Sequence, residues 1–148
     1  MPIVKKSALV LHSANCIYDL VNAVDSYPDF LPWCGGATIE EQSDAHMIAE
    51  IVIGYRGINK SLKTKNQIVR PTETTSGRVE MSLVEGPFKT LNGIWSFTPL
   101  ESHGCRIEFE VQYEFSNAFV SKVVGPVFNQ IAETFVDSFV RRAEELYA

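Results

Sequence analysis

The sequence has few cysteines and no arrangement of them that would hold a metal ion or a disulfide framework. Its three cysteines, Cys16, Cys34 and Cys105, lie far apart, and no C-x-x-C pair or Cys/His cluster occurs in the 148 residues. This spacing argues against a zinc site and against a disulfide-stabilised secreted fold. A chain of this length buries about two-thirds of its unfolded surface and needs no such cross-link. We therefore expect three reduced thiols in a cytoplasmic protein.

Long hydrophobic runs are missing as well. No stretch approaches the roughly 20 apolar residues that a membrane-spanning helix needs. The N-terminal run MPIVKKSALVLHS lacks the apolar core and the cleavage site of a signal peptide, so we expect at most peripheral membrane contact. The formal net charge of −5 argues against a surface that binds nucleic acid broadly and predicts no DNA partner. A local basic patch is still compatible with that charge.

Common catalytic motifs are also absent. There is no G-x-S-x-G, H-E-x-x-H or phosphate-binding loop, and the histidines His12, His46 and His103 have no serine or cysteine partner at motif spacing. Cyclase-type catalysis needs an acid or base inside a pocket, and the sequence indicates none. We predict that the protein is not an enzyme and requires no metal or cofactor.

What is present is a succession of short strands between two helices. Residues 2–11 are predicted to form a strand, Ser13 caps a helix over residues 14–24, and a turn or short helix follows over 27–31. The pattern then changes to period two. It predicts six more strands over residues 37–43, 45–55, 58–69, 77–84, 93–100 and 105–115. Because no repeat or linker interrupts the chain, we predict one domain over residues 1–148.

The last strand and the last helix separate apolar from polar residues most clearly. From Cys105 to Phe115 apolar and polar residues alternate, which predicts an antiparallel strand with one buried and one solvated face. The final helix is expected to begin near Gly125-Pro126 and to end near Leu146. Its apolar stripe contains Phe128, Ile131, Phe135, Phe139, Ala143 and Leu146. We expect this helix to lie across the concave face of a seven-stranded antiparallel sheet, with space for a cavity between them.

The segment SYPDFLPWCGG, residues 26–36, combines large apolar side chains with prolines. Pro28 and Pro32 prevent a regular helix or a central strand. We call it the proline-framed segment, and its large apolar side chains are Tyr27, Phe30, Leu31 and Trp33. Two interpretations fit these residues. They cap one end of the core, or they form a rigid gate at the mouth of a ligand cavity.

Three stretches resemble one known family. YPDFLPWC (27–34), GPFKTLNGIWSF (86–97) and FVDSFVRRAEELY (135–147) are similar to the bacterial RatA and mitochondrial coenzyme Q-binding proteins. These form part of the START-like, or polyketide cyclase/dehydrase-like, helix-grip superfamily, and the resemblance covers essentially the whole chain. It implies an α+β helix-grip fold, with one or two short helices between the first two strands and an apolar tunnel for a long lipid.

The resemblance implies two different functions. Mitochondrial relatives bind ubiquinone and support respiration, whereas the RatA branch is described as a toxin that binds the large ribosomal subunit and blocks its joining to the small one. Fold alone does not choose between them. We predict non-catalytic binding of a ubiquinone-type or polyisoprenoid lipid between sheet and helix, in support of respiratory quinone function. The RatA-type inhibition of translation initiation is the alternative.

The predicted ligand contacts are inward-facing apolar side chains. Those expected to line the cavity or its mouth are Tyr27, Phe30, Leu31, Trp33, Phe88, Leu91, Trp95, Phe109, Val111, Tyr113, Phe128, Ile131, Phe135 and Phe139. Large apolar side chains generally lie inside proteins. The same residues therefore also fit an ordinary core, and the pattern leaves both interpretations open.

One basic stretch stands out in this acidic chain. YRGINKSLKTKNQIVR, residues 55–70, has no acid and contains Arg56, Lys60, Lys63, Lys65 and Arg70. Lys63 and Lys65 share one face of the predicted strand and indicate a positive stripe that would contact ribosomal RNA or an anionic lipid surface. The alternative is a solvated outer face that resists edge-to-edge pairing.

Overall fold

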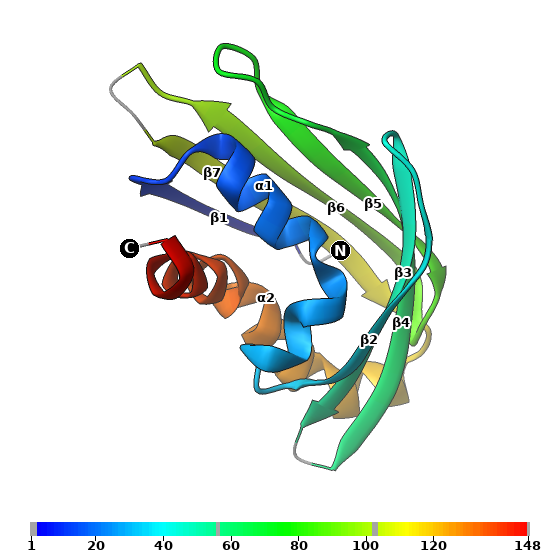
Figure 1. Cartoon of the computed structure of the whole chain (residues 1–148). Helices are drawn as coiled ribbons and strands as arrows, with labels where there is room; N and C mark the ends of the chain where they lie inside the picture. Colours follow the sequence, from blue (N-terminus) through cyan, green and yellow to red (C-terminus); the bar gives the residue numbers. More distant parts are fainter. Residues whose placement is uncertain (1–2, 56, 102–103, 148) are drawn as a thin grey trace.

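The computed structural model describes residues 3–55, 57–101 and 104–147. The elements follow in the order β1 (Ile3–Val10), α1 (Ala14–Asn22), the 3-10 helix η1 (Val24–Asp29), β2 (Cys34–Gln42), β3 (His46–Tyr55), β4 (Ile58–Val69), β5 (Gly77–Glu85), β6 (Phe88–Pro99), β7 (Cys105–Phe115) and α2 (Ala118–Tyr147). The strands form one antiparallel sheet in the order β1-β7-β6-β5-β4-β3-β2 (Figure 1). The predicted α+β arrangement is confirmed.

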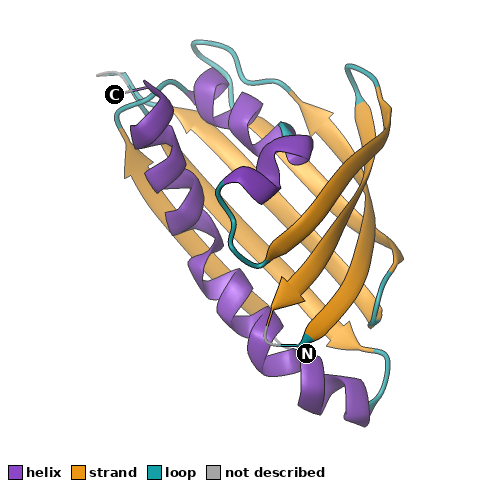
Figure 2. Cartoon of the chain, turned by 60° about the horizontal axis from the view of Figure 1, so that its bottom comes forward, coloured by secondary structure: helices purple, strands orange, loops and turns teal. Residues whose placement is uncertain are grey.

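The sheet bends around α2, and α1 and η1 close the remaining side (Figure 2). β1 and β2 are the two edges of the sheet, and the chain crosses from one edge to the other through α1 and η1. The main contacts of α2 are with β1, β7 and α1, whereas η1 packs against β2. The long helix therefore lies over one half of the sheet, and the inner face of β3, β4 and β5 has few direct contacts with it.

The long helix begins earlier than the sequence predicted. It starts at Ala118 rather than near Gly125, because the side chain of Asn117 caps it and accepts a hydrogen bond from the backbone N–H of Val120 at 2.9 Å. Pro126 therefore lies inside the helix, where it removes one backbone hydrogen bond without ending the element. The predicted apolar stripe is wrong at its last member, since Leu146 is 50% exposed.

Three other boundaries also differ from the prediction. α1 ends at Asn22 rather than at residue 24, and Ala23 leads into η1. β2 begins at Cys34, so Gly35 and Gly36 lie in a strand and do not end a helical turn. β6 begins at Phe88 rather than at residue 93, because its pairing with β7 already starts at Phe88, opposite Phe115.

Irregular strand pairing helps the sheet to bend. The register shifts within β2 and β3 between Cys34 and Gly36, and again between Ile39 and Glu41. A further register shift, between Lys63 and Thr64, interrupts the pairing of β4 with β5. An extra residue in one strand increases the local twist and bends that strand. These bulges allow seven strands to curve around a single helix.

The core contains two of the three cysteines, and all three thiols are free. Cys34 and Cys105 are buried, whereas Cys16 is partly exposed. Burial raises the pKa of the Cys34 thiol. Burial, and to a smaller extent the nearby Cys16, raises the pKa of Cys105 to about 11.

Within the described residues, no helix has both the length and the apolar character needed to cross a bilayer.

We expect native alkylation to modify Cys16 first. The thiolate is the reactive form of cysteine, and a pKa of about 11 keeps Cys105 protonated at ordinary pH. Iodoacetamide treatment at about pH 8, followed by peptide mass spectrometry, should modify Cys16 and leave Cys34 and Cys105 unmodified until denaturant is added. Rapid modification of Cys105 in the native protein would contradict this packing.

Candidate ligand cavity

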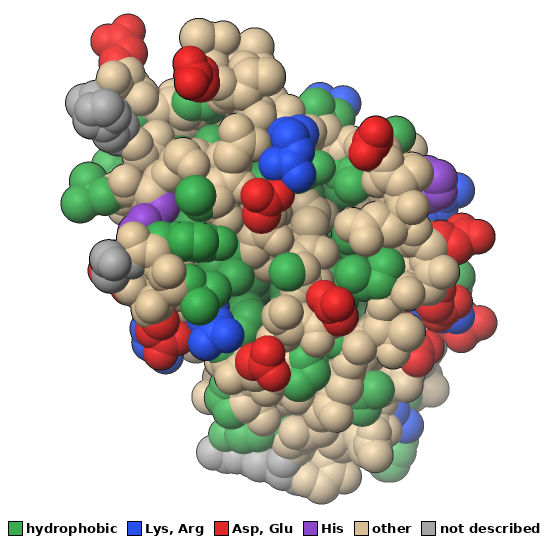
Figure 3. Space-filling model, viewed as in Figure 1, with side chains coloured by type: hydrophobic (Ala, Val, Ile, Leu, Met, Phe, Trp, Pro, Cys, Tyr) green, Lys and Arg blue, Asp and Glu red, His purple; other side chains and the backbone are tan. Residues whose placement is uncertain are grey.

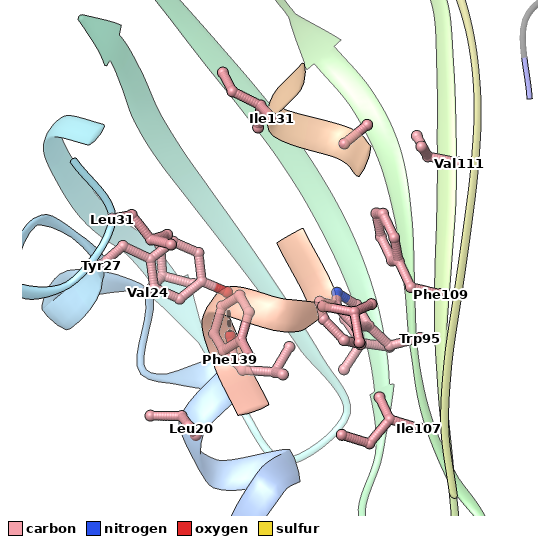
Figure 4. Packing of buried hydrophobic residues seen from close by; sticks show 14 of the residues in the cluster. Leu20, Val24, Tyr27, Leu31, Trp95, Ile107, Phe109, Val111, Ile131 and Phe139 are labelled. Atoms are coloured by element: carbon pink, nitrogen blue, oxygen red, sulfur yellow. Dashed lines mark hydrogen bonds between the residues drawn. The ribbon is translucent and has the colours of Figure 1, made fainter. Parts of the chain in front are cut away.

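An apolar cavity of about 90 Å³ lies between the sheet, the two short helices and α2. Its wall comes from α1, η1, β3 to β7, α2 and Trp33 of the proline-framed segment. Figure 4 shows Tyr27 on one side of this region and Trp95 and Phe109 on the other, with α2 between them. The interior of the fold therefore contains open space where the helix does not reach the sheet.

Nine of the fourteen side chains predicted for the cavity lie in its wall. They come from the proline-framed segment, β6, β7 and α2: Tyr27, Trp33, Leu91, Trp95, Phe109, Val111, Phe128, Ile131 and Phe135. Trp95 is almost fully buried, and its ring centroid lies 4.7 Å from that of Phe109 and 5.5 Å from that of Phe135. The sheet and the helix thus meet at this aromatic group. Ligand contact by these residues stays a prediction.

The other five predicted side chains pack in the core beyond the cavity: Phe30, Leu31, Phe88, Tyr113 and Phe139. Phe88 and Tyr113 surround Phe128 at one end, with ring centroids 4.8 and 4.7 Å from it. Phe139 is fully buried at the other end, 5.2 Å from the ring centroids of Tyr27 and Phe30. These groups close the cavity along α2 and do not line it.

The proline-framed segment folds inward onto the core. The Tyr27 hydroxyl donates a hydrogen bond to the carbonyl oxygen of Val21, and burial raises the pKa of Tyr27. Leu31 is fully buried, and the ring of Phe30 is covered by the guanidinium of Arg142 at 5.3 Å. The segment therefore caps the core through Phe30 and Leu31. Its contribution to the cavity wall is Tyr27 and Trp33.

The wall opposite α2 comes from β3, β4 and β5, and none of its residues was among the predicted ligand contacts. In β4 the inward positions are Leu62, Thr64, Asn66 and Ile68, and three of them, Leu62, Thr64 and Asn66, line the cavity. The Thr64 hydroxyl donates to Asn66 Oδ1 at 2.9 Å. Asn66 is 5% exposed, and it is the one polar or charged residue that is buried in the part of the chain that the structure describes. The period-two pattern of β4 already places Asn66 on the same face as Leu62 and Ile68. The prediction considered only the lysines on this strand.

Two of the five basic side chains are paired with acids from neighbouring elements. Lys63 Nζ lies 2.8 Å from Glu40, and this hydrogen bond raises the pKa of Lys63. Arg70 lies 2.8 Å from Asp19. Lys60 and Lys65 are exposed, and Arg56 lies outside the described residues. The positive stripe is thus narrower than the sequence suggested. On the face that carries α1, basic side chains do not gather into one area (Figure 3).

The cavity wall offers little for acid–base catalysis. Among the described residues that form it, none is Asp, Glu, His, Lys or Cys, and burial keeps Tyr27 protonated. No group of three or more His, Cys, Asp or Glu in residues 3–55, 57–101 and 104–147 could hold a metal ion. What this arrangement can do is bury an apolar molecule.

Known proteins share this fold and sequence pattern. Residues 10–140 match the family described as polyketide cyclase / dehydrase and lipid transport. The chain belongs to this family. It is 43% identical over 144 residues to the ribosome association toxin RatA of Vibrio cholerae, covering 97% of this chain and 96% of that protein. It is also 43% identical over 148 residues to RatA of Escherichia coli, covering 100% and 90%.

More distant similarities extend the comparison. The mitochondrial coenzyme Q-binding protein of Drosophila melanogaster is 24% identical over 143 residues, which cover 92% of this chain and 56% of that protein. A START superfamily protein from Mycobacterium smegmatis has a TM-score of 0.75 at 19% identity, covering 97% and 98%. The Zhui aromatase/cyclase from Streptomyces has a TM-score of 0.74 at 14% identity, covering 97% and 93%. These structures confirm the START-like helix-grip fold.

Phe139 tests whether the end of the cavity is closed by core packing. It is fully buried and contacts Tyr27, Phe30 and Trp95. Phe139→Ala should lower the free energy of unfolding in urea by about 3–5 kcal/mol, because it removes a buried ring and leaves a void. Phe119→Ala on the same helix is the control, since Phe119 is 76% exposed, and should change stability by less than about 0.5 kcal/mol. Equal effects of the two changes would contradict the packing.

Proposed function

We propose that the chain binds a long apolar ligand of the ubiquinone or polyisoprenoid class between the sheet and α2, without catalysing a reaction on it. The observation that carries this proposal is the cavity, which is walled by aromatic and aliphatic side chains and lined by no charged residue among those described. The similarity to a coenzyme Q-binding protein supports the choice of ligand class. Support of respiratory quinone function in the cytoplasm is part of the same proposal.

The size of the cavity sets a condition on this function. Ligand pockets usually measure about 300–1,000 Å³, whereas this cavity of about 90 Å³ holds one small apolar group. A long ligand therefore has to displace side chains from the wall. Met81 is suited to move, because methionine is unbranched and adaptable. Its Cε lies 2.7 Å from the position that a Cβ on Gly93 would occupy, so it fills space that a small neighbour leaves free.

The experiment that tests this function is organic extraction of protein purified natively from a ubiquinone-producing host. Mass spectrometry of the extract should find a quinone or polyisoprenoid at close to one molecule per chain. The protein from which the lipid is extracted must be folded, as judged by circular dichroism. A folded protein that contains no such lipid, and takes up none when it is added, would refute the proposal.

A cavity-filling variant makes the test specific to this site. Ala132 lies in the wall on α2, and Ala132→Leu places an isobutyl group in the open space. We expect the variant to fold and to retain less than about a tenth of the bound lipid, because the ligand then competes with a covalently attached side chain. Ala118→Leu makes the same change at an exposed position of the same helix, and should retain the lipid at the wild-type level. Equal lipid in both variants would place the ligand elsewhere.

A second function, association with the ribosome, is favoured by the sequence comparisons. The chain is 43% identical over nearly its whole length to two proteins named ribosome association toxin. We propose contact with the large ribosomal subunit, with block of subunit joining, through the exposed lysines of β4. Cationic side chains bind RNA phosphates and release counterions, and Lys60 and Lys65 are the exposed members of the basic stretch.

Charge reversal of these two lysines tests the second function. Lys60→Glu with Lys65→Glu should weaken co-sedimentation with large ribosomal subunits by about tenfold or more and flatten its dependence on salt. Lys63 is left unchanged, because its ion pair with Glu40 is part of the sheet surface. Lys122→Glu, at an exposed position on α2, is the control and should bind as the wild type does. Binding that survives the double change would exclude these two lysines as the ribosome contact.

A further inference from the structure

One side chain interrupts the apolar wall of the cavity with an amide. Asn66 lies in that wall and is 5% exposed. Its partners in the sheet are Met47 on β3 and Met81 on β5, and neither side chain carries a nitrogen or oxygen atom. The amide of Asn66 therefore has apolar neighbours on both adjacent strands, where a leucine or valine would be the ordinary choice.

Thr64 satisfies only one end of this amide. The Thr64 hydroxyl donates to Asn66 Oδ1 at 2.9 Å, which assigns the oxygen end to the protein. An asparagine amide also has two N–H donors, and among the described residues these N–H groups have no protein acceptor. Among the described residues, the fully enclosed side-chain polar atoms without a partner are Thr90 Oγ1 and Arg142 Nε. The amide nitrogen of Asn66 is therefore not fully enclosed. The free donor is therefore left for the cavity.

A donor that faces an apolar cavity and finds no acceptor there lowers the stability of the folded state, and an acceptor on a ligand would recover it. We propose that Asn66 is the polar anchor of the ligand and donates a hydrogen bond to a neutral carbonyl oxygen at its head. Thr64 positions the amide by holding its oxygen. This inference rests on the proposed lipid-binding function and deepens it, because it selects one chemical class among apolar ligands.

The surroundings of Asn66 define that class further. No Lys, Arg or His lies among the described residues that line the cavity, so an ionised carboxylate or phosphate would be buried there without a counter-charge. Met47 and Met81 flank the amide, and methionine adapts its shape to flat or irregular groups. The site thus fits an uncharged carbonyl on a hydrocarbon chain. A quinone ring is one source of that oxygen, and a fatty acyl ester is another.

The test compares three probes of similar length by displacement of an apolar fluorescent dye: a short-chain ubiquinone, an alkyl ester and the matched isoprenoid hydrocarbon without oxygen. The wild type should bind the quinone more tightly than the hydrocarbon. Asn66→Leu keeps the branched shape and removes the amide, so the quinone-to-hydrocarbon affinity ratio should fall about tenfold, which is the effect of one hydrogen bond. The ratio cancels any change in cavity volume, because both probes experience it.

Two further variants keep the test decisive. Thr64→Val removes only the hydroxyl that orients the amide, so the ratio should fall in the same direction by a smaller factor. If Asn66→Leu does not fold, Thr64→Val alone tests whether the amide of Asn66 anchors the ligand. Gln67→Leu changes the exposed neighbour of Asn66 on the outer face, and should leave the ratio unchanged.

The outcomes separate this inference from the function on which it rests. A ratio unchanged by both Asn66→Leu and Thr64→Val, in a protein that binds the probes, overturns the anchor and leaves lipid binding intact. A wild type that binds none of the three probes overturns the lipid-binding function and the anchor together. An ester whose binding depends on Asn66 as strongly as that of the quinone supports the anchor and assigns the carbonyl, rather than the ring, as the recognised group.

Discussion

The contact of α2 with the β1–β7 side of the sheet is the constraint on which the other features depend. An α-helix with its side chains is roughly 10 Å wide, whereas seven strands about 4.8 Å apart would span roughly 30 Å if flat. One helix cannot cover such a sheet. Its aromatic stripe packs on the β6–β7 side through Phe135 and Phe139 against Trp95, and Lys6 on β1 pairs with Glu133 at 2.7 Å. The half that remains has to be closed by bending the sheet and by other segments.

This mismatch of widths explains why the proline-framed segment is both irregular and apolar. The chain has to cross from one edge of the sheet to the other, and α1 with η1 makes that crossing. Regular strands or helices through Pro28 would not follow the required path. The large side chains of the segment then complete the core above Phe139, and the short wall residues opposite, such as Ala49 and Val79, leave the space unfilled. The cavity is thus a consequence of how the fold is closed.

The sequence predicted the features that depend on local pattern. The bounds of β4 and β7 agree with the predicted ranges because alternation of apolar and polar residues is a property of one strand. The start of α2 was predicted wrongly because Gly125-Pro126 resembles a helix boundary, while the cap at Asn117 is a weaker signal. The pairing of Lys63 with Glu40 brings together residues of β4 and β2, two strands apart. No pattern within either strand indicates it.

The residues of the cavity divide in the same way. Large aromatic side chains such as Trp95 and Phe109 were found because their size alone makes them conspicuous at inward positions. Asn66 was missed because an asparagine between Lys65 and Gln67 is ordinary on a solvated strand. That Asn66 is a polar residue among apolar ones is evident only from the pairing of β4 with its neighbours, which places Met47 and Met81 beside it. Polar groups in an apolar wall depend on register between strands, and register is set by tertiary pairing.

β4 connects the two proposed functions, since its inward residues face the cavity and its exposed outward residues include Lys65. Coupling between a ligand and a partner on opposite faces requires two states of the strand that each binds differently. β4 lies in the interior of the sheet and pairs with β3 over residues 58–67 and with β5 over residues 63–69. In a strand that is hydrogen-bonded on both sides, side chains change rotamer more readily than the backbone moves. The two faces of β4 are therefore separate surfaces of one element, and the two proposed functions are expected to be separable by mutation.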